Sequence, residues 1–174
     1  MDHQDEYYDN LITMLELIWG EGYMTPGGSD NVEKMFNGIE TAGKRILDIG
    51  CGLGGQAFEM ANTFGADVVG IDLEAPLIKR ATEAATKMGL QDRCKFRIAK
   101  AGALDFPDQS FDIVATSAAI TQVKDKANLF GECYRVLKPG GYLTCYDWTN
   151  QKNPCQKTCF TGSKWKVLPL HLKH

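Results

Sequence analysis

The sequence lacks long apolar runs, internal repeats and low-complexity stretches, and each absence narrows the class of protein. No apolar run reaches the roughly 18 residues that a bilayer-spanning helix needs, so no transmembrane segment is expected. Residues 1–6 are acidic, which is unlike a secretory signal. With 174 residues, 44% of them hydrophobic, the chain fits one globular domain with a sizeable core.

Cysteines and histidines are few and poorly spaced for metal or disulfide chemistry. The six cysteines lack the paired spacing of a zinc site, which favours free thiols in a reducing compartment. Cys155 and Cys159 form a C-x3-C pair, for which metal binding is the less favoured interpretation. His3, His171 and His174 all lie near the termini, so no core histidine is available as a general base. We predict a cytoplasmic protein that binds no metal.

The net charge of −3 provides no general attraction to nucleic acid. Residues 151–174 differ from the rest, because they hold five lysines and no acid. A basic tail can bind nucleic acid or an acidic membrane surface, but a solvated end is the preferred interpretation. We therefore expect neither a nucleic acid nor a membrane as partner.

Short apolar runs alternate with helical stretches from residue 45 onward. The strands are expected near 45–50, 67–72, 95–99, 111–116 and 141–147, and the helices near 55–64, 75–88 and 125–137. This alternation is typical of βαβ units, and their right-handed crossovers place helices on both faces of the sheet. The predicted fold class is α/β, a Rossmann-like, doubly wound and mostly parallel sheet.

The two ends of the chain depart from this alternation. Residues 1–43 are predicted to form an N-terminal helical cap of the same compact domain, with a first helix at 7–19 and a second, capped by Ser29 or Asp30, that runs to about Ile39. The core follows at 44–150, and 151–174 is a basic tail. Only 26 residues follow Trp148, so the C-terminal part looks truncated.

The fifth predicted strand needs a neighbour. Residues 142–146 are apolar and would otherwise form an exposed sheet edge, which is an association hazard. Residues 164–170 can form a strand that Pro169 restricts to the edge of a sheet. We therefore expect either that the tail folds back onto this edge or that a second protomer covers it, which would give a homodimer.

Residues 46–55, ILDIGCGLGG, are the most informative stretch, a buried strand that opens into a glycine-rich turn and then a helix. Gly50, Gly52 and Gly55 satisfy the dinucleotide pattern G-x-G-x-x-G, with Asp72 about twenty residues later. Asp48 favours another ligand, because a carboxylate repels a pyrophosphate but attracts an ammonium. A ligand with an ammonium at the turn and a ribose near Asp72 is S-adenosylmethionine.

Further motifs follow in a characteristic order. Residues 48–54, Asp72, residues 106–112 and residues 136–141 together resemble the class I S-adenosylmethionine-dependent methyltransferases. The N-terminal part, with Tyr7, residues 16–20, Tyr23 and a Gly-Gly pair at 27–28, is similar to the phosphoethanolamine and sarcosine/dimethylglycine N-methyltransferases.

This resemblance implies S-adenosylmethionine as cofactor and S-adenosylhomocysteine as product. It implies that Asp48 faces the ammonium through water, that Asp72 accepts from both ribose hydroxyls and that Leu73 packs on the adenine. The remaining predicted cofactor residues are Gly50, Gly52, Gly54, Gln56, Ala101 and Ser117. The alternatives are an ordinary strand-to-helix turn for the glycines, a helix cap for Asp72 and core packing for Leu73.

Some positions depart from the family pattern. Lys100 stands where the family has an acceptor for the adenine amino group, and lysine only donates. The backbone of Ala101, or Asp105 through a shifted loop, can replace that acceptor. Ala118 and Gln122 stand where phosphobase methyltransferases have an acid and a histidine.

The substrate side therefore depends on other residues. Tyr7 is predicted to orient the nucleophile and Gln122 to assist it, while Tyr8, Tyr23, Tyr146 and Trp148 are candidates for binding the substrate. Packing of the cap or of the sheet edge is the alternative for these aromatic residues.

The sequence thus predicts methyl transfer from S-adenosylmethionine to a small molecule, with an amine favoured as acceptor. Such an enzyme mainly has to align donor and acceptor, and orientation alone can contribute about 7–11 kcal/mol. The alternative is a degenerate methyltransferase fold that acts as a non-catalytic binding or regulatory partner. A nicotinamide oxidoreductase is a distant third hypothesis.

Overall fold

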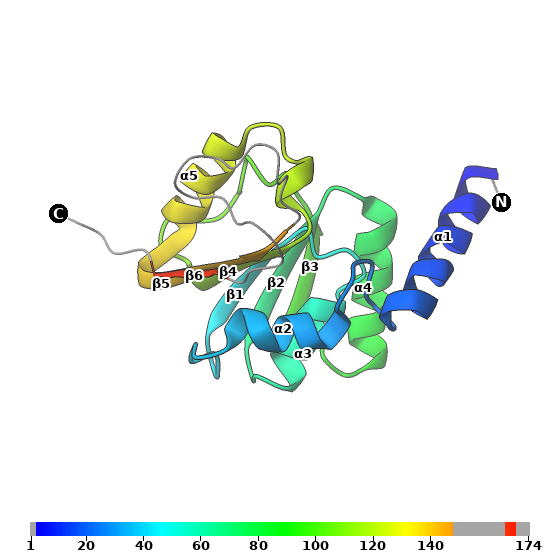
Figure 1. Ribbon diagram of the computed structural model, residues 1–174, viewed down its shortest axis with the longest axis horizontal. Coiled ribbons are helices and arrows are strands. Elements are labelled where there is room, and N and C mark those ends of the chain that lie inside the picture. The colour runs from blue at the N-terminus through cyan, green and yellow to red at the C-terminus, as the bar shows by residue number, and fades with distance from the viewer. Residues whose placement is uncertain (1–2, 148–165, 170–174) are drawn as a thin grey trace.

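The computed structural model describes residues 3–147 and 166–169, with side chains described for residues 9–147. Helices and strands alternate along most of this length (Figure 1). The helices are α1 (His3–Trp19), α2 (Gly28–Phe36), α3 (Gly55–Asn62), α4 (Ala75–Lys87) and α5 (Lys126–Val136), with a 3-10 turn at Ile120–Gln122. The strands are β1 (Arg45–Ile49), β2 (Asp67–Asp72), β3 (Cys94–Ile98), β4 (Phe111–Ser117), β5 (Leu137–Tyr146) and β6 (Lys166–Pro169).

The strands form one sheet in the order β3-β2-β1-β4-β5-β6. The first five are parallel, and β6 pairs antiparallel with β5. Strand order reverses between β1 and β4, and in such sheets ligands bind at the carboxyl ends of the strands beside this switch point. The predicted fold class, a mostly parallel Rossmann-like sheet, is confirmed.

The edge of β5 is paired with the tail of the same chain. Tyr142 to Cys145 of β5 lie opposite Pro169 to Lys166 of β6, so the expectation that the tail folds back is confirmed. Pro169 is tolerated there because β6 is the last strand of the sheet. A homodimer through this edge stays a prediction, as does the division into cap, core and tail.

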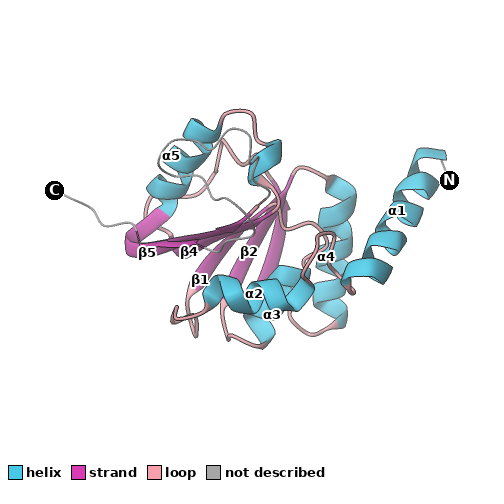
Figure 2. Ribbon diagram, viewed as in Figure 1, coloured by secondary structure: helices cyan, strands magenta, loops and turns pink. Residues whose placement is uncertain are grey.

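Helices cover both faces of the sheet (Figure 2). On one face, α2, α3 and α4 pack on alternate strand residues that include Ile46 and Ile113. On the other face, α5 packs on the intervening residues, among them Leu47 and Val114. This alternation follows from the pleat of a strand, whose successive side chains point to opposite faces. Asp48 follows Leu47 and therefore points to the face covered by α2 and α3.

The N-terminal helices differ from the prediction in one detail. Helix α2 begins at Gly28, after Gly27 in the left-handed conformation, so the prediction of a Ser29 or Asp30 cap was wrong. The Asn31 side chain lies where a Cβ on residue 27 would be, 2.0 Å from its Nδ2, so only glycine fits there. No helix in residues 3–147 is long and apolar enough to cross a membrane.

Helix α1 lies at the periphery beside α4 (Figure 1). Ile12 of α1 is fully buried and packs with Leu53 and Leu77. An ion pair between Asp9 and Arg80 adds a second connection between α1 and α4.

Candidate functional site

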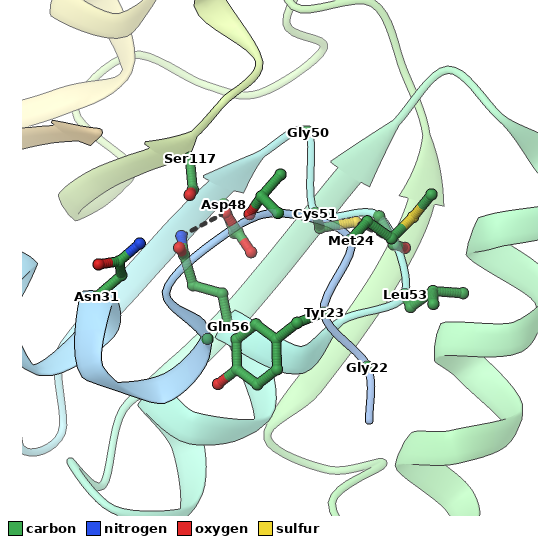
Figure 3. A pocket seen from close by; sticks show the side chains of 13 residues that line it. Gly22, Tyr23, Met24, Asn31, Asp48, Gly50, Cys51, Leu53, Gln56 and Ser117 are labelled. Carbon is green, nitrogen blue, oxygen red and sulfur yellow. Dashed lines mark hydrogen bonds between the residues drawn. The ribbon is translucent and has the colours of Figure 1, made fainter. Parts of the chain in front are cut away.

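A pocket of about 460 Å³, counted with the part that opens to solvent, lies at the carboxyl end of β1. The glycine-rich turn after β1 forms one side of it, and the segment before α2 forms the other (Figure 3). Of the residues predicted from the sequence, it brings together Asp48, Gly50, Gly52, Gln56, Ser117 and Tyr23. These residues come from three separate stretches of the chain, namely Tyr23 before α2, residues 48–56 from the end of β1 to the start of α3, and Ser117 at the end of β4.

Asp48 is the most unusual group in this pocket. Its side chain is 1% exposed, and its Oδ1 accepts a hydrogen bond of 2.9 Å from Gln56 Nε2. Its Oδ2 is buried without a hydrogen-bond partner among the described residues. Burial, followed by the nearby charge of Asp72, raises the pKa of Asp48 to about 7, although the Gln56 hydrogen bond lowers it. A cation that binds next to Oδ2 would therefore supply a missing partner.

Asp72 joins the glycine-rich turn to the end of β2. Its Oδ2 accepts from the Gly52 N–H at 2.9 Å, and its Oδ1 accepts from the Glu74 N–H at 3.1 Å. The N-cap residue of α4 is Glu74, so Asp72 does not cap this helix as the alternative interpretation predicted. Asp72 instead supports the turn before α4 through its hydrogen bond from the Glu74 N–H. A carboxylate has more than one lone pair on each oxygen, so both oxygens can still accept from hydroxyl groups.

Gly54 and Gly55 are not among the residues that line this pocket, and each allows a close packing contact, while a cofactor role for Gly54 stays a prediction. Gly54 precedes α3 in the left-handed conformation, and a Cβ there would lie 2.8 Å from the Phe58 ring and 2.9 Å from the Phe96 ring. A Cβ on Gly55 would lie 2.5 Å from the Gly22 carbonyl oxygen, which accepts from the Gly55 N–H at 3.0 Å. Gly55 therefore allows the N-terminal segment to close over the turn.

Asn31 was not among the predicted site residues. It is 8% exposed, lines the pocket, and donates from Nδ2 to the Pro26 carbonyl at 2.6 Å. Figure 3 shows it beside Ser117 and Gln56. A buried asparagine that follows two glycines is a weak sequence signal, because its position depends on how the turn before α2 folds.

The predicted adenine side lies at the neighbouring strand ends. Leu73 and Ile98 are 59% and 58% exposed, and Asp72 pairs with Ile98 across β2 and β3. Exposed apolar side chains at adjacent strand ends offer a surface for a flat ring. Ala101 packs instead against the core beneath α5, and Lys100 is exposed.

Gln122, the predicted catalytic residue whose side chain is described, is not among the residues that line the pocket. Gln122 is exposed in the 3-10 turn, where its Nε2 donates to the Ala118 carbonyl at 3.4 Å. Ala118 has a positive φ of 56°, and its N–H donates to the Tyr146 carbonyl at 2.7 Å. Tyr146 packs against the core beneath α2 and α3.

Three predicted aromatic side chains lie outside the described residues. Tyr7 and Tyr8 belong to α1, but their side chains are not described, and Trp148 is not described at all. Their roles stay predictions.

Tyr23 lines the pocket and is half-buried. Burial, with the charges of Glu59 and Asp48, raises the pKa of Tyr23 to about 12. Its phenol is therefore protonated at neutral pH, so it can donate a hydrogen bond but cannot act as a general base.

The described cysteines bear out the expected free thiols. Cys51, Cys94, Cys133 and Cys145 are unpaired, and burial raises the pKa of each thiol. Among the residues whose side chains are described, no three His, Cys, Asp or Glu side chains gather as a metal site requires. Cys155 and Cys159 lie outside the described part of the chain.

Comparison with known proteins shows the family to which the chain belongs. A family model described as a methyltransferase domain matches residues 40–173. Phosphoethanolamine N-methyltransferase 3 of Arabidopsis thaliana is 35% identical over 144 residues, which cover 82% of this chain and 29% of the plant protein. The 2-methyl-6-phytyl-1,4-hydroquinone methyltransferase of Synechocystis sp. is 40% identical over 123 residues, 70% of this chain and 37% of that protein.

A solved structure is similar over the same region. Haemonchus contortus phosphoethanolamine N-methyltransferase 2, in complex with phosphomonomethylethanolamine and S-adenosylhomocysteine, matches with a TM-score of 0.77 and 34% identity. The match covers 83% of this chain and 34% of that one. The chain thus spans about a third of the length of the relatives that it matches.

Proposed function

The chain belongs to the methyltransferase domain family, and from this premise we propose that it binds S-adenosylmethionine in the pocket and methylates a small-molecule amine. The observation that carries the proposal is the buried Asp48, whose Oδ2 has no hydrogen-bond partner among the described residues and which lies beneath the glycine-rich turn. An uncompensated carboxylate oxygen in a buried site is costly unless a ligand pairs with it. The ammonium of an amino-acid-like ligand fits this requirement.

The other groups fit the rest of the cofactor. Asp72 at the end of β2 would accept from the ribose hydroxyls, and the exposed Leu73 and Ile98 would pack on the adenine. Asn31 and Ser117 are uncharged, and none of the described residues that line the pocket is a base that would repel a sulfonium. Lys100 is exposed and donates only, so the adenine amino group would need a backbone acceptor near Ala101.

The bound cofactor supplies a methyl group on a positively charged sulfur. A neutral amine held in line with that sulfur would accept the methyl group as the sulfur leaves as a neutral thioether. Tyr23 stays protonated and Gln122 cannot take a proton, so neither provides a base. The chain would therefore hold a deprotonated amine in line with the sulfonium, and water would take the proton when the amine binds. Tyr7 is proposed to orient this amine.

An amine acceptor is supported by the names of two relatives. The proteins of Arabidopsis thaliana and Haemonchus contortus are phosphoethanolamine N-methyltransferases, and the nematode structure contains a phosphorylated amine. The Synechocystis relative is named for a hydroquinone acceptor, so the family by itself does not select the amine. A cytoplasmic location and a homodimer remain sequence-based predictions.

A degenerate, non-catalytic binding protein is the second candidate. Lys100, Ala118 and Gln122 replace residues that the related enzymes use, and Gln122 is exposed in the 3-10 turn. This alternative predicts either weak cofactor binding or binding without turnover.

Calorimetric titration with S-adenosylmethionine and S-adenosylhomocysteine, with NAD as control, tests the cofactor. We expect micromolar binding of both adenosyl ligands, and loss of binding in Asp72→Ala. Asp67→Ala is the matched control, because Asp67 is exposed at the opposite end of the same strand. A cooperatively folded chain that binds neither adenosyl ligand would refute the proposal.

Turnover is tested separately from binding. The chain would be incubated with S-adenosylmethionine and amines that include phosphoethanolamine, and S-adenosylhomocysteine release would be followed. Release that depends on the amine supports the enzyme. Tight cofactor binding without release with any amine would favour the non-catalytic alternative.

A further inference from the structure

The outer side of α1 is apolar and exposed. Met14, Leu17 and Ile18 expose 49%, 86% and 55% of their surface. Ile12, on the inner side of the same helix, is fully buried. Figure 1 shows α1 at the edge of the molecule, with its outer side turned away from the sheet. A helix with apolar residues on both sides is normally covered on both sides, so the face formed by Met14, Leu17 and Ile18 lacks a cover among the described residues.

A groove lies on the inner flank of α1, between this helix, α3 and α4. It encloses about 1340 Å³, counted with the part that opens to solvent, and is far larger than the cofactor pocket. Four acids and two bases line it: Glu16, Glu21, Glu59, Glu83, Arg80 and Lys87. Arg80 pairs with Asp9 and Glu83 pairs with Lys79 at 4.0 Å, which leaves three acids against Lys87, so the groove is acidic.

The apolar face and the acidic groove adjoin along α1. Glu16 lines the groove, and Leu17, the next residue, lies about 100° further around the helix. A second helix lying along α1 could therefore cover Leu17 with its apolar side and reach the groove with long side chains from its flank.

Charge selects among the possible occupants. Helix α1 contains four acids and neither lysine nor arginine. Pairing of α1 with the same helix of a second copy would bring together two helices that carry acids and no bases, with Asp9 already offset by Arg80 of the same copy. An anionic membrane surface would be repelled in the same way. Lysine and arginine on a partner would complement the groove.

We propose that the outer face of α1 and the adjoining groove bind a basic amphipathic helix of another protein. Its apolar side covers Met14, Leu17 and Ile18, and its basic residues face Glu21 and Glu59. This is the helix-in-groove mode of recognition, in which apolar anchors give affinity and flanking charges give selectivity. The proposal does not depend on the cofactor or on catalysis.

The test is fluorescence anisotropy of the full chain with a labelled leucine/lysine peptide of about 18 residues and helical periodicity. A leucine/glutamate peptide with the same apolar pattern is the control ligand. We expect saturable binding of the basic peptide, at least about 10-fold weaker binding of the acidic one, and weakening by added salt.

Variants of the chain locate the binding face. The double variant Leu17→Ser, Ile18→Ser is expected to weaken binding about 10-fold or more without loss of helical circular dichroism, because both side chains are exposed. Phe130→Ser is the matched control, since Phe130 is 41% exposed on the distant α5, and it should leave binding unchanged. Glu21→Lys should weaken binding of the basic peptide, since Glu21 is exposed and lines the groove.

Several outcomes would overturn the proposal. Equal binding of the acidic peptide, or an equal loss in the Phe130→Ser control, would show that binding is nonspecific. A dimer in sedimentation that the double variant dissociates would assign the face to a second copy. Sedimentation with phosphatidylcholine vesicles that the double variant abolishes would assign it to a membrane.

Discussion

Replacing Asp48 by asparagine should remove a loss of stability that the ligand-free chain suffers as pH rises, and should weaken its binding of a cationic ligand. Burial raises the pKa of Asp48 from 3.8 to about 7, so the folded chain keeps this proton at a pH where the unfolded chain has lost it. The unfolded state then binds fewer protons, and the free energy of unfolding falls as pH rises between these two pKa values. Above about pH 7 the loss is complete.

The size of the effect follows from the two pKa values. Each pH unit over which only the folded chain is protonated costs about 1.4 kcal/mol. From pH 5 to pH 8 the wild-type chain should therefore lose about 3 kcal/mol through Asp48. Asparagine has no such proton, so the stability of Asp48→Asn relative to wild type should rise by about this amount over the same interval. A fixed cost from the asparagine amide cancels in this difference.

The assay is urea unfolding of both proteins at pH 5 and pH 8. Asp112→Asn is the matched control. Partial burial raises the pKa of Asp112, but hydrogen bonds from the Arg45 N–H and from Lys138 outweigh it, so the pKa lies below its ordinary value. The stabilisation that ionised Asp112 provides is fully present above the pKa that Asp112 has in the unfolded chain. It is lost only as pH falls through the lower pKa that Asp112 has in the folded chain. Asp112→Asn should therefore destabilise equally at pH 5 and pH 8.

Two results would refute the reasoning about Asp48. One is a difference between Asp48→Asn and wild type that does not change from pH 5 to pH 8. The other is full retention of S-adenosylmethionine affinity in Asp48→Asn. A lost hydrogen bond to a charged group is worth about 1.5–3 kcal/mol, which corresponds to roughly 10- to 100-fold weaker binding in calorimetry.

Three further substitutions test the surroundings of the pocket. Gly55→Ala should displace the Gly22 segment and weaken cofactor binding about 10-fold. Gly131→Ala should leave binding unchanged, because a Cβ on Gly131 would have no atom within 4 Å. Equal cofactor affinities of the two variants in calorimetry would contradict the packing argument. Asn31→Ala should lower the free energy of unfolding by about 1 kcal/mol and raise the cofactor Kd; an unchanged Kd would limit Asn31 to a structural role. Tyr7→Phe should lower turnover and leave cofactor affinity unchanged. An unchanged turnover rate would indicate that Tyr7 only packs within the N-terminal cap.

The fold could be predicted from local sequence patterns. Each predicted strand and helix from β1 to β5 appears, because apolar periodicity and glycine-rich turns reflect the backbone conformation of neighbouring residues. Element ends were less accurate. Strand β5 begins at Leu137, before the expected residue 141, and the register between β4 and β5 shifts between Phe111 and Ile113. Such an irregularity depends on the partner strand, which the local pattern does not contain.

Part of the site could also be predicted. Asp48, Gly52 and Asp72 belong to one βαβ unit, so their proximity follows from the strand and turn order. Asn31 was missed because its place at the pocket depends on the turn before α2. The packing role of Gly55 was missed, because the Gly22 carbonyl that it contacts comes from a separate segment.

The sequence by itself determined the fold class, the glycine-rich turn and the family, since all three depend on the order and spacing of residues along the chain. Only the tertiary structure decided the pKa of Asp48, which depends on burial under α2 and α3. It also decided contacts between remote segments, such as the 2.9 Å hydrogen bond from Thr144 Oγ1 to the Met35 carbonyl, which are 109 residues apart. Local patterns report the backbone of neighbouring residues. Burial, ionisation and an uncovered helix face instead depend on which distant residues the packed chain brings together.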